Sequence, residues 1–173
     1  MKKVVIAALL SAFVAAPVLA ADTSKISVGA SYGLGTYAGS SGVLSGRIDY
    51  DISDMAGNNP VKARIGFDHY SQDLGGFGMG TVTWSTNVFY GGAYYDFNKQ
   101  LKLDAKIHPF AGLGFGFGST SCSGATWCSV ASSPSVGGLY WIGGVQYNVA
   151  RNIDAELGYT AFSGISFGAN FKF

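Results

Sequence analysis

His69, Ser71 and Asp73 are the residues of this sequence whose types and spacing come nearest to catalytic chemistry. An imidazole, a hydroxyl and a carboxylate are the groups of nucleophilic acyl transfer, and alternate residues of a β-strand lie on one face. Such residues are about 6.6 Å apart, however, which is too far for a direct hydrogen bond from His69 to Ser71. We therefore favour the alternative, a polar strand end that enters a loop, and expect no catalytic residue.

Charged residues that alternate with apolar ones form a second candidate site. The predicted network consists of Arg47, Asp49, Asp51, Lys62, Arg64, Asp154 and Glu156, and the same face is predicted to carry Asp68, Asp104, Lys106 and Lys172. The acidic pair Asp49 and Asp51 can face a basic pair on the next segment in a plausible antiparallel register. Charges removed from water need partners, so we expect a network of ion pairs, with a narrow proton or ion path as the alternative.

The two cysteines, Cys122 and Cys128, lie in the Ser-rich segment 119–136. A zinc site would need further ligands, and the two histidines lie in other segments. In an oxidising compartment we expect a disulfide that staples this segment. Trp127 lies between the cysteines, and we interpret it as a candidate partner contact, with local packing as the alternative. No metal and no cofactor are expected.

The N-terminus predicts export from the cytoplasm. Lys2 and Lys3 precede an apolar run from Val4 to Ala16 that is shorter than the roughly 20 residues of a membrane-spanning helix. Small residues up to Ala20 complete the pattern of a secretory signal peptide. We expect residues 1–20 to be removed and residues 21–173 to form one domain.

The elements that position these side chains are predicted to be β-strands. Apolar residues alternate with small or polar ones in eight segments, 26–34, 44–52, 61–68, 82–94, 107–117, 139–149, 153–162 and 165–173. A soluble sandwich would point the apolar face inward. Glycines on the opposite face, strands of about 9 to 11 residues and aromatic residues near strand ends favour the inverted arrangement of a membrane barrel. The predicted fold is all-β, a transmembrane eight-stranded antiparallel up-and-down barrel.

The strand faces and connections follow from the same pattern. In 82–94 we assign the even-numbered residues, Tyr90 and Tyr94 included, to the lipid-facing side. Three connections, 53–60, 98–101 and 150–152, are predicted as short periplasmic turns. Three longer ones, 37–42, 71–80 and 119–136, are predicted as external loops. Pro109 lacks a backbone donor and should lie at a strand start or bulge.

The composition and the glycine spacing argue against binding of nucleic acid or of a phosphate ligand. The formal net charge is +1 and 12% of the residues are charged, so no basic surface for nucleic acid is expected. The Gly-rich stretch around Gly112, Gly114 and Gly116 has strand spacing, and we predict lumen packing instead of phosphate binding.

The end of the chain, "ISFGANFKF", carries a second kind of signal. Ser166, Gly168, Phe171 and the terminal Phe173 are similar to the recognition sequence that the barrel-assembly machinery reads on a final strand. With "VFYGGAYYDF" (88–97) and "HPFAGLGFGFG" (108–118), the chain resembles the small eight-stranded outer-membrane barrels, the group of the outer-membrane protein A transmembrane domain, the protein X barrels and the opacity-type proteins. The resemblance implies the outer membrane of a Gram-negative bacterium.

The function expected from these observations is non-enzymatic. We predict a monomeric barrel with a structural or adhesin-like role through its external loops. Its partners would be outer-membrane lipid, lipopolysaccharide, the barrel-assembly machinery and an extracellular ligand, and nucleic acid is excluded. The alternatives are a narrow channel and, from the resemblance of His69 and Ser71 to a motif of lipid A deacylase barrels, a lipid A acyl hydrolase.

Overall fold

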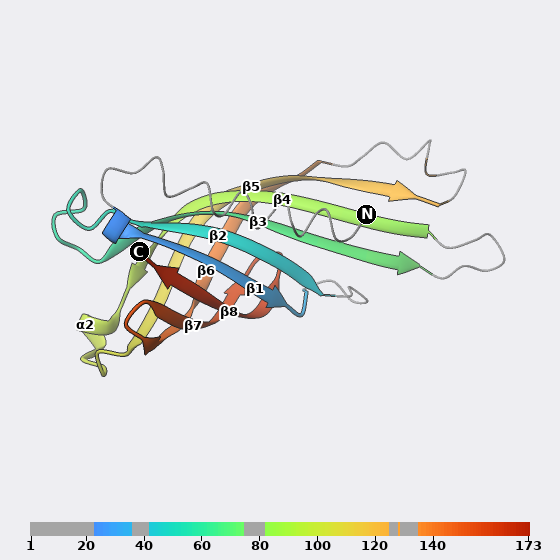
Figure 1. The fold of residues 1–173 in the computed structure, drawn as a ribbon. Helices are drawn as coiled ribbons and strands as arrows, with labels where there is room; N and C mark the ends of the chain where they lie inside the picture. Colours follow the sequence, from blue (N-terminus) through green and yellow to red (C-terminus); the bar gives the residue numbers. More distant parts are fainter. Residues whose placement is uncertain (1–22, 36–41, 75–81, 125–127, 129–134) are drawn as a thin grey trace.

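Eight antiparallel strands close into a barrel, which confirms the predicted fold class (Figure 1). The computed structural model describes residues 23–35, 42–74, 82–124, 128 and 135–173, so the predicted signal peptide, 1–20, lies outside the described residues. The strands are β1 (Ile26–Gly33), β2 (Val43–Asp51), β3 (Val61–Leu74), β4 (Val82–Asp96), β5 (Ile107–Ser123), β6 (Ser135–Ala150), β7 (Ile153–Thr160) and β8 (Gly164–Lys172). Each strand pairs with its neighbours in the chain, and β1 pairs with β8, so the sheet has no free edge.

The apolar face of the sheet points outward, as β5 illustrates. Leu113, Phe115 and Phe117 are exposed on the outer wall of the barrel. The alternate residues are glycines that face the lumen, where a Cβ on Gly114 would lie 2.2 Å from the carbonyl oxygen of Gly91. Large side chains therefore fit only on the outer face of this strand, and the predicted inversion is confirmed.

The predicted face of β4 is wrong. Tyr90 and Tyr94, assigned to the lipid side, are buried in the lumen, and Phe89 is exposed instead. Both faces of this strand are apolar, so alternation alone does not distinguish them. The choice depends on space in the lumen, because a Cβ on Gly66 of the neighbouring strand would lie 2.3 Å from the Tyr90 ring.

The strands differ in height around the barrel. The strands β3 to β6 have 14, 15, 17 and 16 residues, whereas β1, β2, β7 and β8 have 8 or 9. The long strands extend toward one side in Figure 1, beyond the others. Parts of the predicted loops 71–80 and 119–136 are therefore strand, because β3 continues to Leu74 and β5 to Ser123. Hydrophobic alternation stops before these polar residues, although their backbones continue the ladder.

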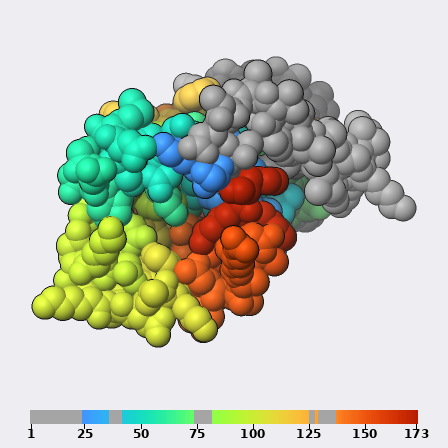
Figure 2. Space-filling model, turned by 60° about the vertical axis from the view of Figure 1, so that its left-hand side comes forward, coloured from blue at the N-terminus to red at the C-terminus, as the bar shows by residue number. Residues whose placement is uncertain are grey.

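The opposite end, here called the turn end, collects the short connections. The β2–β3, β4–β5 and β6–β7 turns, α2 (Asn98–Leu101), η2 (Thr23–Lys25) and the C-terminus lie there. Figure 2 shows the β2–β3 turn in teal, the α2 region in yellow-green and the last strands in orange and red on this side. Asp104 and Lys106 are exposed in the β4–β5 connection, so their predicted place in the lumen is wrong. Pro109 lies at the start of β5, as predicted.

We call the other end of the barrel, where the tips of the tall strands β3 to β6 lie, the loop end.

Within the described residues, no helix has the length and apolar character needed to cross a membrane.

Candidate functional site

Arg64 of β3 is the centre of a charged cluster in the lumen. Its Nε donates to Asp49 Oδ1 at 2.6 Å and its Nη2 to Asp49 Oδ2 at 2.8 Å. The same guanidinium donates to both oxygens of Glu156, at 3.2 and 3.1 Å. It also lies over the rings of Tyr94 and Phe110, with its Cζ 4.7 and 5.3 Å from their centroids. Two carboxylates and two aromatic faces therefore surround one cation that is almost fully buried.

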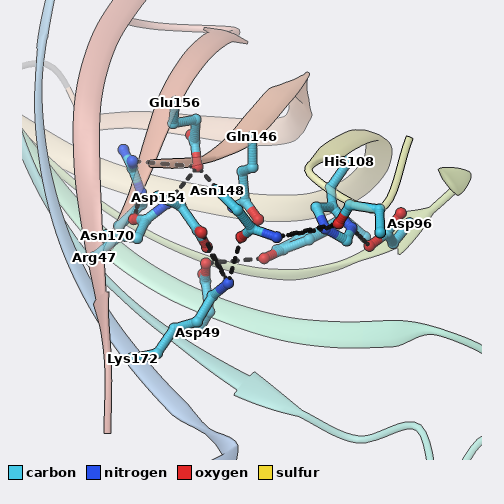
Figure 3. Close-up of polar contacts among 12 residues, drawn as sticks. Arg47, Asp49, Asp96, His108, Gln146, Asn148, Asp154, Glu156, Asn170 and Lys172 are labelled. Atoms are coloured by element: carbon cyan, nitrogen blue, oxygen red, sulfur yellow. Dashed lines mark hydrogen bonds and ion pairs between the residues drawn. The ribbon is translucent and has the colours of Figure 1, made fainter. Parts of the chain in front are cut away.

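Arg47 of β2 is the second buried cation. Its Nη2 is 3.2 Å from Glu156 Oε2, and its Nη1 donates to Ser31 at 2.8 Å. Its Nε donates to Asn170 Oδ1 at 3.0 Å. Glu156 is thus shared by two arginines, and two further amides, those of Gln146 and Asn170, donate to its Oε2 (Figure 3).

The cluster joins all the strands of the barrel. Its members are Ser31, Arg47, Asp49, Arg64, Tyr94, Phe110, Gln146, Glu156 and Asn170, which come from β1 to β8. Two buried cations balance two buried anions, and the amides and hydroxyls take up further donors and acceptors. A network that links every strand in this way fixes side chains in place across the lumen.

A chain of polar contacts crosses the lumen nearer the turn end. Lys172 donates to Asp154 and to Asn148, both at 2.8 Å. Asn148 Nδ2 lies 3.1 Å from His108 Nε2, and His108 Nδ1 lies 2.8 Å from Asp96 Oδ2. The contacts run in sequence through β7, β8, β6, β5 and β4, as the dashed lines of Figure 3 show. This row of side chains lies between the charged cluster and the periplasmic turns.

Two further predicted network residues lie at the rim of the turn end. Asp51 and Lys62 are half-buried and face each other across β2 and β3, while Asp49 is opposite Arg64. Both line a hollow of about 220 Å³ at this rim, together with His108 and Lys172. The Asp51 carboxylate accepts the backbone N–H of Ser53 at 2.8 Å and so fixes the start of the turn.

Aromatic rings fill the lumen toward the loop end. Tyr90 and Tyr140 stack with their centroids 4.1 Å apart, and Phe162 packs on the second ring at 5.7 Å. The Tyr140 hydroxyl donates to Asp68 at 2.5 Å and is 3.0 Å from Thr160 Oγ1. This layer and the charged cluster occupy successive levels of the lumen, so side chains obstruct the axis at both levels.

Sequence reasoning missed several members of these layers. Tyr94 and Tyr140 were obscured because their strands carry aromatic residues on both faces. Gln146 and Asn170 share the lumen-facing parity of Glu156 and Asp154, which they oppose in the β6–β7 and β7–β8 registers. An Asn or Gln side chain at a position that alternation places on the lumen-facing side of its strand is the signal that could have identified them.

The candidate catalytic residues of β3 lie on the outer face of the tall strands. Each contacts a residue of β4: His69 Nδ1 lies 2.8 Å from Asn87 Oδ1, Ser71 accepts from Ser85 at 3.3 Å, and Asp73 accepts from Thr83 at 2.7 Å. These bonds run across the sheet, perpendicular to the direction that a His–Ser relay along β3 would require. The arrangement matches a polar outer wall.

Cys122 and Cys128 form the predicted disulfide. Cys122 belongs to β5, opposite Trp84 of β4, so the bridge attaches the following segment to the top of a tall strand. Trp127 lies outside the described residues.

The residues of the predicted assembly signal divide between the two faces of β8. Phe171 and Phe173 are exposed on the outer wall, whereas Ser166 is buried. Gly168 lies at the β1–β8 seam, where a Cβ would come within 2.3 Å of the Ala30 carbonyl oxygen. This glycine is therefore required for the close approach of the two strands that complete the barrel. Among the described residues, no group of three His, Cys, Asp or Glu side chains could hold a metal ion.

Fold and lumen together define a small membrane barrel, apolar outside and filled inside. The family model described as "Outer membrane protein beta-barrel domain" matches residues 6–172, and the chain belongs to this family. It is a Gram-negative outer-membrane protein, as the resemblance implied. In this family the turn end faces the periplasm and the loop end faces outward.

Solved structures agree with this assignment. Neisserial surface protein A is 20% identical, with a TM-score of 0.57 over 86% of this chain and 96% of that chain. The N-terminal β-barrel domain of Pseudomonas aeruginosa OprF is 13% identical, with a TM-score of 0.56 over the same shares. Ail, the attachment invasion locus protein of Yersinia pestis, is 15% identical, with a TM-score of 0.51 over 86% and 96%. These likenesses show the fold. No curated protein matches the sequence.

Proposed function

We propose that this chain is a non-enzymatic, monomeric surface protein that contacts an extracellular ligand at its loop end. The observation that carries the proposal is the height of β3 to β6. Strands of 14 to 17 residues exceed the roughly 9 to 11 residues that cross the bilayer. The excess forms a paired, disulfide-tethered wall outside the membrane, where a partner can reach it.

The filled lumen supports this function over transport. A barrel of eight strands is just wide enough for side chains to fill it or for one small ligand. Here the Arg64 cluster and the Tyr90–Tyr140 stack occupy the axis at two levels. We expect planar bilayers that contain the whole mature protein to remain electrically silent, and stepwise conductance would favour the channel alternative.

The distribution of charge restricts the class of ligand. Ail has been crystallised with the heparin analogue sucrose octasulfate, which is a polyanion. In this sequence, residues 65–98 and 107–150 contain no Lys or Arg, so the parts of the tall strands beyond Arg64 and the segments that join their tips carry neither residue. A polyanion has no partner there. We infer that the ligand is uncharged, a neutral saccharide or a polypeptide surface.

Binding to arrayed saccharides and matrix proteins tests the proposal. The probe is the mature barrel in nanodiscs, compared with the double variant Cys122→Ser, Cys128→Ser and with Lys102→Gln at the turn end as the matched control. The double variant should lose retention on a neutral surface that the control keeps, and heparin should retain neither. Retention on heparin, or equal binding by all three proteins, would contradict it.

Two targeting steps belong to the same proposal. The signal peptide, residues 1–20, directs export, and the last strand is read by the barrel-assembly machinery through Ser166, Gly168, Phe171 and Phe173. The exposure of Phe171 and Phe173 supports this reading, because side chains on the outer face are accessible to a second protein. The lumen ion pairs of Arg47, Arg64 and their partners have a structural role in this proposal.

A further inference from the structure

The hollow of about 220 Å³ at the turn end lies in the mouth of the lumen. Side chains from β2, β3, β4, β5, β6 and β8 line it, so it is inside the ring of strands and not on the lipid-facing wall. Gln146 closes its inner side, because this buried amide donates to Glu156 of the charged cluster. The hollow therefore has room for several water molecules, is closed toward the loop end and is accessible from the periplasm.

The charged residues that line the hollow balance one another. Two lysines, Lys62 and Lys172, and two aspartates, Asp51 and Asp96, contribute to its wall. A ligand with a net charge would leave one sign in excess in a partly buried space, which is unfavourable. A neutral molecule that carries a separate positive and negative group, a zwitterion, matches this lining.

One lysine and one aspartate of the hollow already have partners within the protein. Lys172 donates to Asp154 and Asn148, both at 2.8 Å. Asp96 Oδ2 lies 2.8 Å from His108 Nδ1, on the other side of the lumen (Figure 3). These contacts hold both side chains in place, so Lys172 and Asp96 form fixed walls of the hollow.

The other pair, Lys62 and Asp51, has free capacity for a ligand. Within the part of the chain that the structure describes, the Lys62 ammonium makes no hydrogen bond or ion pair. The Asp51 carboxylate accepts the Ser53 N–H through Oδ1, and its Oδ2 has no partner among the same residues. Lys62 and Asp51 are opposite each other in the β2–β3 register, so their Cβ atoms are about 5 Å apart. A cation and a carboxylate oxygen thus remain available side by side.

We propose that this hollow binds a free α-amino acid from the periplasm. The two charges of an α-amino acid are attached to one carbon, so they can reach Lys62 and Asp51 together. The ligand carboxylate accepts from Lys62, and its ammonium donates to Asp51 Oδ2. The side-chain oxygen of Gln146, which has no other partner among the described residues, accepts a second bond from the ammonium.

The hollow also restricts which amino acid it can hold. Its volume and the balance of its charges favour a short, neutral side chain. The site lies at the opposite end of the barrel from the proposed extracellular contact, so the two proposals are independent of each other.

NMR titration of the mature barrel in nanodiscs tests the site with L-alanine as the probe. Propionate and ethylamine are matched control ligands, because each has the size of alanine but only one of its two charged groups. Alanine should shift the turn-end amide signals in a saturable way, with a Kd about tenfold lower than that of either control, the scale of one hydrogen bond to a charged group. Equal affinity for alanine and propionate, or no saturable shift with alanine, overturns the proposal.

Three variants locate the binding and separate the two charges. Lys62→Met should weaken alanine binding about tenfold, because the ligand carboxylate loses its charged donor. Asp51→Asn keeps an oxygen for the Ser53 N–H but removes the negative charge, so it should abolish the preference for alanine over propionate. Lys99→Met, at an exposed position of α2 at the same end, is the control and should bind alanine normally.

The amide signals of the strands report in each variant that the barrel is folded. Normal alanine binding by Lys62→Met, or an equal loss in Lys62→Met and Lys99→Met, would show that the hollow is not the site. An unchanged preference for alanine in Asp51→Asn would contradict the proposed contact of its ammonium.

Discussion

The lumen and the tall outer wall use polar residues in opposite ways. In the lumen, Arg47 and Arg64 lie within 3.2 Å of Glu156, in a cluster that is almost fully buried. On the wall, Ser, Thr and Asn predominate, and the segments 65–98 and 107–150 contain no Lys or Arg. The charges of the lumen cluster thus have partners inside the protein, whereas neutral donors and acceptors predominate on the tall outer wall, where the protein meets its surroundings.

The contrast between lumen and wall implies that the buried lumen residues determine stability and the wall residues determine recognition. A buried ion loses its hydration, so removing its partner is costly, whereas an exposed hydroxyl exchanges one partner for water at little cost. Changes in the lumen should therefore alter unfolding, and changes on the wall should alter binding. The predictions below test this division.

The largest effect is expected at Arg64. Arg64→Met leaves Asp49 and Glu156 buried beside one remaining arginine and should lower the free energy of unfolding by about 3–5 kcal/mol. Urea unfolding of the barrel refolded in lipid vesicles measures it. Lys62→Met, on the same strand at the half-buried rim, is the matched control and should cost about 0.5 kcal/mol or less. Equal losses in the two variants would show that burial does not determine the effect.

A smaller loss is expected in the aromatic layer of the lumen. Tyr140→Phe removes the hydroxyl that donates to Asp68 and should cost about 1–3 kcal/mol, because the buried carboxylate loses this donor. The exposed Tyr159 is the control, and Tyr159→Phe should be near neutral. The same unfolding assay compares the two, and a neutral Tyr140→Phe would mean that Asp68 has adequate alternative donors.

The disulfide should affect stability less and binding more. The double variant Cys122→Ser, Cys128→Ser opens a short loop, which limits the cost to about 2 kcal/mol. Ligand retention should be lost while the barrel still refolds. A large loss of barrel stability without a change in binding would show that the disulfide stabilises the barrel, as the lumen residues do, and does not support ligand binding.

At the end of the chain, the expected effect is kinetic. Phe173→Ser should lower the yield of folded barrel in the outer membrane of cells, with refolding in vesicles unchanged, because the exposed ring is proposed as a contact of the assembly machinery. Gly168→Val should impair both, since its side chain would collide with the β1 backbone at the seam. Normal cellular yield of Phe173→Ser would remove the proposed signal.

The smallest effect is expected at the hydroxyl of Ser71. Mass spectrometry of lipid A from cells with the intact gene, without it and with Ser71→Ala should give identical acyl compositions. A mass shift that depends on both the gene and Ser71 would make the outer wall catalytic and end its interpretation as a binding surface.

Alternation of residue types predicted the strands where the two faces differ clearly. On β5, glycine alternates with Leu113, Phe115 and Phe117, and the predicted face is correct. On β4, aromatic residues occur on both sides, and the prediction failed for Tyr90 and Tyr94. The pattern predicts loops at the polar ends of β3 and β5 because these residues lack hydrophobic alternation, although their backbones pair with β4.

The candidate site shows the same limit. Alternation along the strands places Arg47, Asp49, Arg64 and Glu156 on the same face from the sequence alone. Asp104 and Lys106 are exposed, which shows that the alternation of strand residues does not extend into turns. The hydrogen bonds from Tyr94 to Asp49 and from Arg47 to Asn170 depend on closure of the barrel.

The sequence by itself determined the strand count, the antiparallel meander, the outward apolar face and the disulfide, because these follow from local alternation and cysteine number. Only the tertiary structure decided which face of β4 is buried, how far the tall strands rise, and which groups meet Arg64. Those features depend on the space inside a closed ring, where residues 92 positions apart, Arg64 and Glu156, come into contact. Local pattern carries no information about that space until β1 and β8 are paired.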